Sequence, residues 1–157
     1  MAPAAQLAEA SVPKGSSYHY FTSKDAFGEA MLKSYFADFL ADMDGVPARS
    51  GRSAAERLMA YWQQWRETRS VEECQGKCLV VKLGAEVADL SESMRLALEE
   101  GTSAIVDRIE HTIISGLEDG SLSVDGDPRD VAQTLYSMWL GASVMAKIQR
   151  SPAPRLV

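Results

Sequence analysis

The chain has 157 residues, of which 46% are hydrophobic, and a formal net charge of −6. A chain of this length can bury one hydrophobic core without disulfides or metal, and it has neither a membrane-spanning run of about 20 apolar residues nor a secretory signal pattern. We therefore expect a soluble, cytoplasmic protein whose acidity argues against a broad nucleic-acid-coating surface but leaves room for a local contact patch.

The N-terminal segment predicts two short helices. Residues 4–10 have a helical pattern, Ser11 and Val12 form a turn, and a second helix begins at Pro13 and ends near Phe21. Helix, short turn, helix is the geometry of a helix-turn-helix, in which the second helix enters the major groove of DNA. The alternative is a capped surface helix whose aromatic side chains pack into a core.

The second of these helices carries side chains suited to a DNA contact. Tyrosine and lysine side chains can reach phosphates, exposed amides at a helix start can hold an anion, and small polar side chains can touch base edges. The candidates for phosphate contacts are Lys14, Tyr18, Tyr20 and Lys24. The amides near Gly15 and Ser16 are the candidates for holding an anion, and Ser17 and His19 are the candidates for touching base edges.

Two helices are predicted next in the chain. The first begins after Ser23, an N-cap candidate, carries apolar residues every three or four positions, and ends at Asp44-Gly45. Residues 45–52 form a loop, and residues 53–56 have the pattern of a capping box. The helix that follows carries three large aromatic residues that could line an apolar ligand pocket or belong to a plain core: Tyr61, Trp62 and Trp65.

Three further helices complete an all-α pattern, a short helix-turn-helix followed by a helical bundle. One runs from Cys78 to about Leu90, one ends at Asp119-Gly120, and the last begins at Asp127-Pro128 and stops before Pro152. The last helix is apolar on more than one side, so we expect it to be buried nearly all round. Either a central position in the chain or a second subunit would bury it.

Enzymatic chemistry is not expected. No carboxylate pair, Ser-His arrangement or phosphate-binding glycine loop has convincing spacing. Cys74 and Cys78 are more typical of free thiols than of a bridge, and a metal site is disfavoured because His19 and His111 are distant in sequence. We therefore expect no metal and no cofactor.

The run VPKGSSYHYFTSKDAF, residues 12–27, resembles the recognition-helix signature of TetR-family transcriptional regulators, and the helical order of the remaining chain is similar to that family. The resemblance implies a DNA-binding head over residues 1–24 and a ligand-binding and dimerisation domain over residues 25–157. It also implies a homodimer that pairs through its last two helices, binds palindromic operator DNA, and is released by a small molecule or a chemical modification. Tyr18, Tyr20 and Lys24 match the backbone-contacting positions of the family, and Lys14, Gly15 and His19 lie on its DNA-facing side.

The N-terminal segment also departs from the family pattern. Relatives carry a full helix ahead of the helix-turn-helix, whereas this chain begins at Met1 with too few residues for one. Ser17 and Ser11 stand where a bulky apolar residue and a turn glycine are usual. The sequence therefore leaves two alternatives: a repressor with a truncated start, or an effector-binding and dimerisation module without DNA binding.

The segment CQGKCLVVKLGAEVADLSESMR, residues 74–95, resembles the electrophile- and oxidant-responsive branch of the family, which includes maleimide- and acrylate-responsive repressors. In that branch a cysteine opens a helix and a lysine of the last helix can combine with it after oxidation; Cys78 and Lys147 match these positions. A helix N-terminus and the neighbouring Lys77 favour the reactive thiolate of Cys78. The alternative is a buried, inert thiol.

Overall fold

The computed structural model describes residues 23–45, 51–68 and 79–149. These residues form helices and no strands, which confirms the all-α prediction. None of the described helices has the length and apolarity needed to cross a bilayer. The helices are α3 (Lys24–Gly45), α4 (Ala54–Thr68), α5 (Leu79–Leu90), α6 (Glu92–Glu118) and α7 (Pro128–Gln149).

The helix starts are capped by the residues that the sequence indicates. Ser23 Oγ accepts a hydrogen bond from the Ala26 amide at 3.1 Å. At the start of α4, the Ser53 amide donates to Glu56 Oε2 at 2.8 Å and the Glu56 amide donates to Ser53 Oγ at 3.2 Å, so the predicted capping box is confirmed. These bonds satisfy amides that have no partner within the helix.

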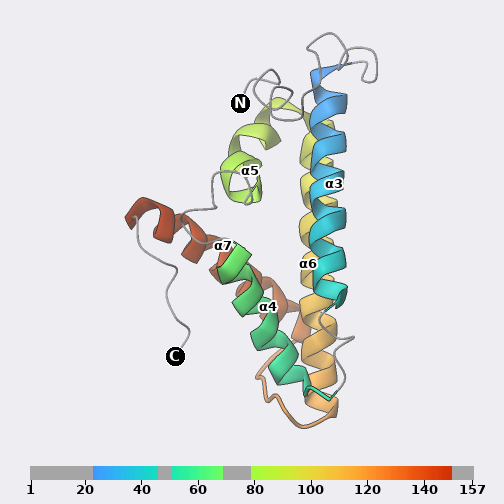
Figure 1. Ribbon diagram of the computed structural model, residues 1–157, viewed down its shortest axis with the longest axis vertical. Coiled ribbons are helices and arrows are strands. Elements are labelled where there is room, and N and C mark those ends of the chain that lie inside the picture. The colour runs from blue at the N-terminus through green and yellow to red at the C-terminus, as the bar shows by residue number, and fades with distance from the viewer. Residues whose placement is uncertain (1–22, 46–50, 69–78, 150–157) are drawn as a thin grey trace.

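Helices α3 and α6 lie side by side and run in the same direction (Figure 1). Early in both helices Gly28 of α3 faces Met94, and at the end of α3 Asp44 pairs at 2.7 Å with Arg108, which lies just past the middle of α6. Four apolar side chains in the middle of α6 are almost completely buried, so this helix is the centre of the core: Ile105, Val106, Ile109 and Ile113.

Helix α3 packs directly against the backbone of α6 at Gly101. A Cβ atom at this position would lie 2.1 Å from the Phe36 ring, inside any allowed contact distance. Because glycine has no side chain, the aromatic ring of Phe36 can lie directly against the α6 backbone. Gly101 therefore sets the spacing of the α3–α6 pair.

Helix α4 begins where α6 ends and returns along the bundle. Asp119, just after α6, accepts a hydrogen bond from the Ala54 amide at 3.0 Å, and Ser121 Oγ accepts one from the Ala55 amide at 3.1 Å. Hydrogen bonds from Ser121 and the Ala54 amide hold the pKa of the Asp119 carboxyl below its usual range. The loop after α6 thus caps α4, which fixes the angle at which α4 leaves the core.

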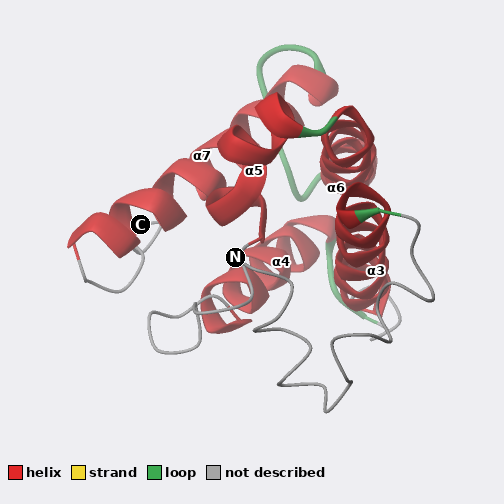
Figure 2. Cartoon of the chain, turned by 90° about the horizontal axis from the view of Figure 1, so that it is seen from above, coloured by secondary structure: helices red, strands yellow, loops and turns green. Residues whose placement is uncertain are grey.

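Within the chain, helix α7 buries only one side, so the predicted burial nearly all round would require a second subunit. Tyr136 and Trp139 face the core and are 2% and 4% exposed. Met138 and Met145 do not face the core, because their side chains are 54% and 48% exposed. The last turns of α7 extend away from the other helices (Figures 1 and 2), so a central position within the chain is excluded.

Candidate functional site

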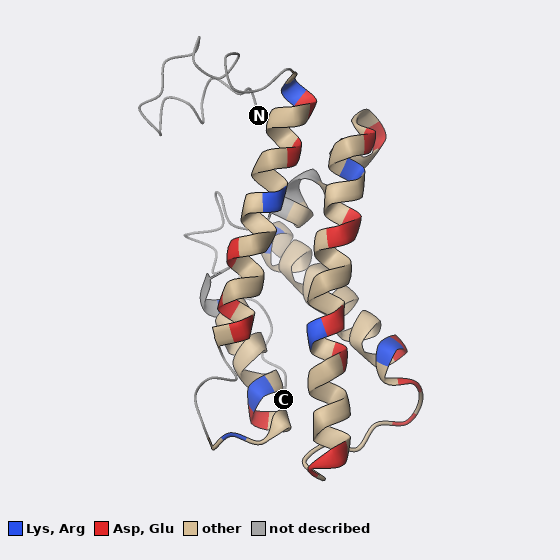
Figure 3. Cartoon of the chain, turned by 90° about the vertical axis from the view of Figure 1, so that its right-hand side faces the viewer, with Lys and Arg blue, Asp and Glu red and all other residues tan. Residues whose placement is uncertain are grey.

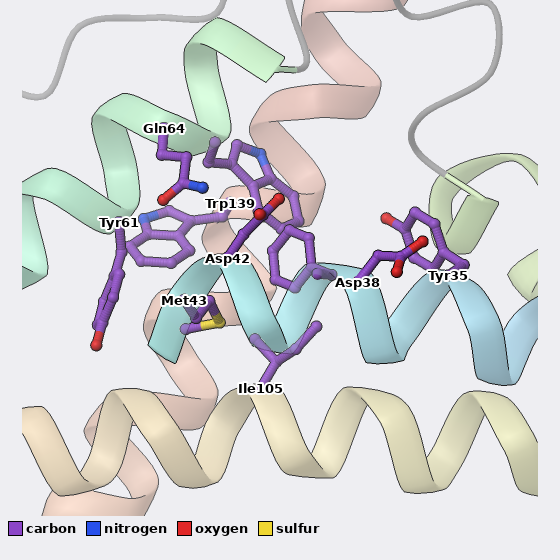
Figure 4. Close-up of a pocket in the computed structure, with 10 residues that line it drawn as sticks. Tyr35, Asp38, Asp42, Met43, Tyr61, Gln64, Ile105 and Trp139 are labelled. Atoms are coloured by element: carbon purple, nitrogen blue, oxygen red, sulfur yellow. The ribbon is translucent and has the colours of Figure 1, made fainter. Parts of the chain in front are cut away.

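A cavity of about 290 Å³ lies between α3, α4, α6 and α7 (Figure 4). Helix α3 contributes half of its lining, α4 contributes three residues, and α6 and α7 contribute one each. Five of the ten lining side chains are aromatic and two are carboxylates. The lining residues are Tyr35, Asp38, Phe39, Asp42, Met43, Tyr61, Gln64, Trp65, Ile105 and Trp139.

Trp65 of α4 is at the centre of the aromatic wall. The Phe39 ring meets it edge to face, with centroids 5.6 Å apart and planes at 87°. Trp139 packs beside it at 6.1 Å, and Trp62 packs on Trp139 at 5.2 Å. Of the three aromatic residues predicted for a pocket, Tyr61 and Trp65 line the cavity, whereas Trp62 is not among its lining residues.

The polar groups of the wall are unevenly satisfied. Trp65 Nε1 donates to Ser143 Oγ at 3.0 Å, and Ser143 Oγ donates to the Trp139 carbonyl at 2.9 Å. The indole nitrogens of Trp62 and Trp139 are buried and have no hydrogen-bond partner in the described part of the chain. Trp65 therefore connects the cavity to the backbone of α7 through Ser143. The indole N–H groups of Trp62 and Trp139 have no acceptor among the described residues.

The acidic part of the cavity was not predicted from the sequence. Asp38 and Asp42 lie one helical turn apart, and each neighbours an aromatic residue of α3, Tyr35 or Phe39, at helical spacing. That spacing was a usable signal. The contribution of Trp139 gave no such signal, since it depends on how α7 packs against α4.

The other predicted site residues are not brought together by the described structure. Lys24 is exposed in the first turn of α3, and Lys147 is exposed in the last turn of α7. His111 is exposed on α6, and no group of three or more potential metal ligands occurs within residues 23–45, 51–68 and 79–149. The remaining predicted residues lie outside the described residues: Lys14, Gly15, Ser16, Ser17, Tyr18, His19, Tyr20, Cys74 and Cys78.

Comparison with known proteins identifies the family. The sequence model of the family described as "Tetracyclin repressor-like, C-terminal domain" matches residues 54–156, which include α4 to α7. The chain belongs to the TetR family. It is 40% identical over 148 residues to the HTH-type transcriptional repressor NemR of Escherichia coli K12, an alignment that covers 94% of this chain and 74% of NemR.

Two further TetR-family relatives are named as transcriptional regulators. The repressor DhaR of Mycobacterium sp. strain GP1 is 33% identical, over 94% of this chain and 72% of DhaR. The regulator AcuR of Cereibacter sphaeroides is 31% identical, over 94% of this chain and 68% of AcuR. The predicted family, and its function in transcriptional regulation, are therefore confirmed.

Solved TetR-family structures have the same fold. The reduced form of Escherichia coli NemR superposes with a TM-score of 0.82 at 40% identity, covering 96% of this chain and 78% of that one. A regulatory protein TetR from Rhodobacter sphaeroides superposes with a TM-score of 0.81 at 30% identity, covering 93% and 77%. The bundle around the cavity is thus the fold of a transcriptional regulator.

Proposed function

We propose that this TetR-family protein represses transcription by binding palindromic operator DNA as a homodimer, and that an effector releases it. The release acts through a small molecule in the cavity or through an electrophile or oxidant at Cys78. The observation that carries the proposal is the likeness to transcriptional repressors along nearly the whole chain.

The exposed side of α7 supports a homodimer. Met138, Met145 and Ile148 recur at helical spacing and are 54%, 48% and 68% exposed, with Gly141 between them. An apolar stripe of this kind on a soluble chain marks an interface, and a two-fold axis lets the same stripe cover itself. Ile114 and Leu117 add exposed apolar surface on α6, 38% and 42% exposed.

The charge distribution limits where DNA would bind. Acidic residues outnumber basic ones in both α3 and α6 (Figure 3), so these helices would repel phosphates. A DNA contact would therefore use the predicted residues 14–20, which lie outside the described residues, together with the exposed Lys24. Such a contact would weaken steeply as salt rises, because it releases counterions.

Trp65 supports a route from the cavity to α7. Its indole lines the cavity and donates to Ser143, which precedes Lys147 by one helical turn and Val144 by one residue. A ligand that displaces the indole would break this bond and favour a different position of α7. Since α7 carries the apolar stripe, the ligand would change the pairing of the two copies.

The chemical route to release uses Cys78 and Lys147. Hypochlorous acid oxidises the Cys78 thiolate to a sulfenic acid: the sulfur gains the hydroxyl group, and chloride is released. The Lys147 amine then attacks the sulfur, forming an S–N bond with loss of water. Because Lys147 is on α7, this bond would also act on the helix that carries the apolar stripe.

The experiment compares the chain with two α7 variants. Ile148→Glu places a charge in the exposed stripe, and Gln133→Glu places the same charge elsewhere on α7. Sedimentation should show dimers for the wild type and Gln133→Glu but monomers for Ile148→Glu. Fluorescence anisotropy with an inverted-repeat duplex should show salt-sensitive binding that the monomeric variant loses by at least ~10-fold.

The same assay separates the proposal from its alternative. A dimer with no salt-sensitive DNA binding would contradict the repressor and leave an effector-binding and dimerisation module. A wild-type monomer would contradict the interface. The chemical route requires that hypochlorite release DNA from the wild type and not from Cys78→Ser.

A further inference from the structure

The described lining of the cavity carries negative charge and no basic side chain. Asp38 and Asp42 project from α3 into the space that Tyr35 and Trp139 also face (Figure 4). Neither carboxylate has a hydrogen bond or an ion pair with the described residues, in contrast to Asp44, two residues beyond Asp42, which pairs with Arg108. The cavity therefore presents two carboxylates that no residue in the described part of the chain neutralises.

Aromatic rings from three helices surround the same space. Tyr35 and Phe39 come from α3, Tyr61 and Trp65 from α4, and Trp139 from α7. The faces of such rings carry partial negative charge and attract cations that have no hydrogen-bond donors, such as quaternary ammonium groups. An anion would be repelled by both the rings and the carboxylates, and a neutral ligand would gain only from burial.

We propose that the cavity binds an organic cation, in which a quaternary ammonium group is carried by a small aromatic or alkyl body. The inference rests on the proposed function, in which this cavity is an effector site, and it names the chemical class of the effector. The volume of about 290 Å³ is just below the roughly 300–1,000 Å³ typical of ligand pockets, so the cation is small. Its body packs against Trp65 and Trp139, and its charge lies toward Asp38 and Asp42.

The tryptophans of the protein report on this binding. All 3 tryptophans of the chain, Trp62, Trp65 and Trp139, belong to the aromatic cluster, so a ligand in the cavity should change the intrinsic fluorescence. The probes are benzyltrimethylammonium, its neutral isostere neopentylbenzene, and the anion phenylacetate. We expect the cation to bind at least ~10-fold more tightly than the neutral isostere, and phenylacetate not to bind.

Neutral variants of the two carboxylates test the charge directly. Asp38→Asn and Asp42→Asn should each weaken binding of the cation by ~3–10-fold and leave binding of neopentylbenzene unchanged. Asp125→Asn is the matched control, because Asp125 is exposed in the loop between α6 and α7 and does not line the cavity. Thermal melting of each variant checks that the fold is retained.

The outcomes distinguish the inference from the proposed function. Equal affinity for the cation and its neutral isostere, or variants that bind both alike, would overturn the cation inference even if the cavity still took a ligand. Cation binding that depends on the carboxylates but leaves the operator complex intact would support the inference and contradict the cavity as the effector site. If none of the three probes bound, the cation inference would be overturned. DNA binding by the same sample would still support the proposed repressor function.

Discussion

Helix α3 packs its two sides in opposite ways. On one side Leu32 and Phe36 are 0% and 3% exposed, and Phe36 lies directly against the backbone of α6 at Gly101. On the other side Tyr35 and Phe39 face a cavity shared with α4 and α7. The neighbouring aromatic residues Tyr35 and Phe36 therefore differ in their surroundings. Phe36 fills a close contact with α6, whereas Tyr35 borders an empty cavity.

The difference separates what stabilises the fold from what the fold can bind. The α3–α6 contact is filled to the point where one additional carbon atom would not fit. The cavity leaves space empty, and beside it the indole donors of Trp62 and Trp139 have no acceptor in the described residues. Both features cost stability, which makes the cavity side the better candidate for function.

Gly101→Ala should produce the largest effect, because it disrupts the filled contact. The new methyl group would overlap the Phe36 ring, and overpacking of this kind costs about 1–3 kcal/mol. For a chain of this size that corresponds to a fall in melting temperature of roughly 2–12 °C. Thermal unfolding followed by circular dichroism measures it.

Gly84→Ala is the matched control for that substitution. Gly84 is inside α5, and a Cβ atom there would have nothing within 4 Å. Replacing an open helical glycine by alanine should stabilise the chain by about 0.5–1 kcal/mol. If Gly101→Ala stabilised the chain as much as Gly84→Ala, helix propensity would outweigh any overlap with the Phe36 ring, and the filled contact at Gly101 would be contradicted.

On the cavity side, Trp65→Phe should cost more stability than Trp139→Phe. Both variants lose ring volume, but the first also breaks the hydrogen bond to Ser143, worth about 0.5–1.5 kcal/mol. The second removes a buried donor that has no acceptor in the described residues, which offsets part of its loss. We expect a difference of about 1–2 kcal/mol in the free energy of unfolding, measured by urea titration. Equal losses would show that Trp139 has an acceptor.

Much of the fold could be predicted from the sequence because its signals are local. Ser23, Ser53 and Glu56 cap helices through bonds that span three residues, so their pattern is visible in the chain. The family was visible in the same way, from short runs of residues. The placement of residues 14–20 on DNA and the pairing of Cys78 with Lys147 stay predictions.

The cavity and the buried side of α7 could not be predicted in this way. Helix α7 has apolar residues on all sides, and the contacts that select Tyr136 and Trp139 for the core come from Trp65, more than 70 residues earlier in the chain. Met138 and Met145 are as apolar as the residues that are buried. Periodicity therefore identified the helix but not the direction that each side faces.

The smallest expected effect concerns the ion pair at the end of the α3–α6 contact. Arg108 Nε and a second guanidinium nitrogen donate to the two carboxylate oxygens of Asp44 at 2.7 and 2.8 Å, and these bonds lower the pKa of the Asp44 carboxyl. A carboxyl whose pKa is lower in the folded state stabilises the fold above its unfolded value, near 4, and loses that contribution as pH falls through the folded value. Asp44 is 58% exposed, so solvent screening limits the contribution to below about 1 kcal/mol.

Asp44→Asn should therefore flatten the loss of stability between pH 5 and pH 3 without changing the Gly101 contact. The measurement is urea unfolding of the wild type, Asp44→Asn, Arg108→Gln and the double variant at both pH values. The double variant should behave like either single variant, because each substitution already removes the same pair. If Asp44→Asn kept the full acid sensitivity, the ion pair would contribute nothing at this end of α3, and close packing at Gly101 and the buried residues of α6 would hold the two helices together without it.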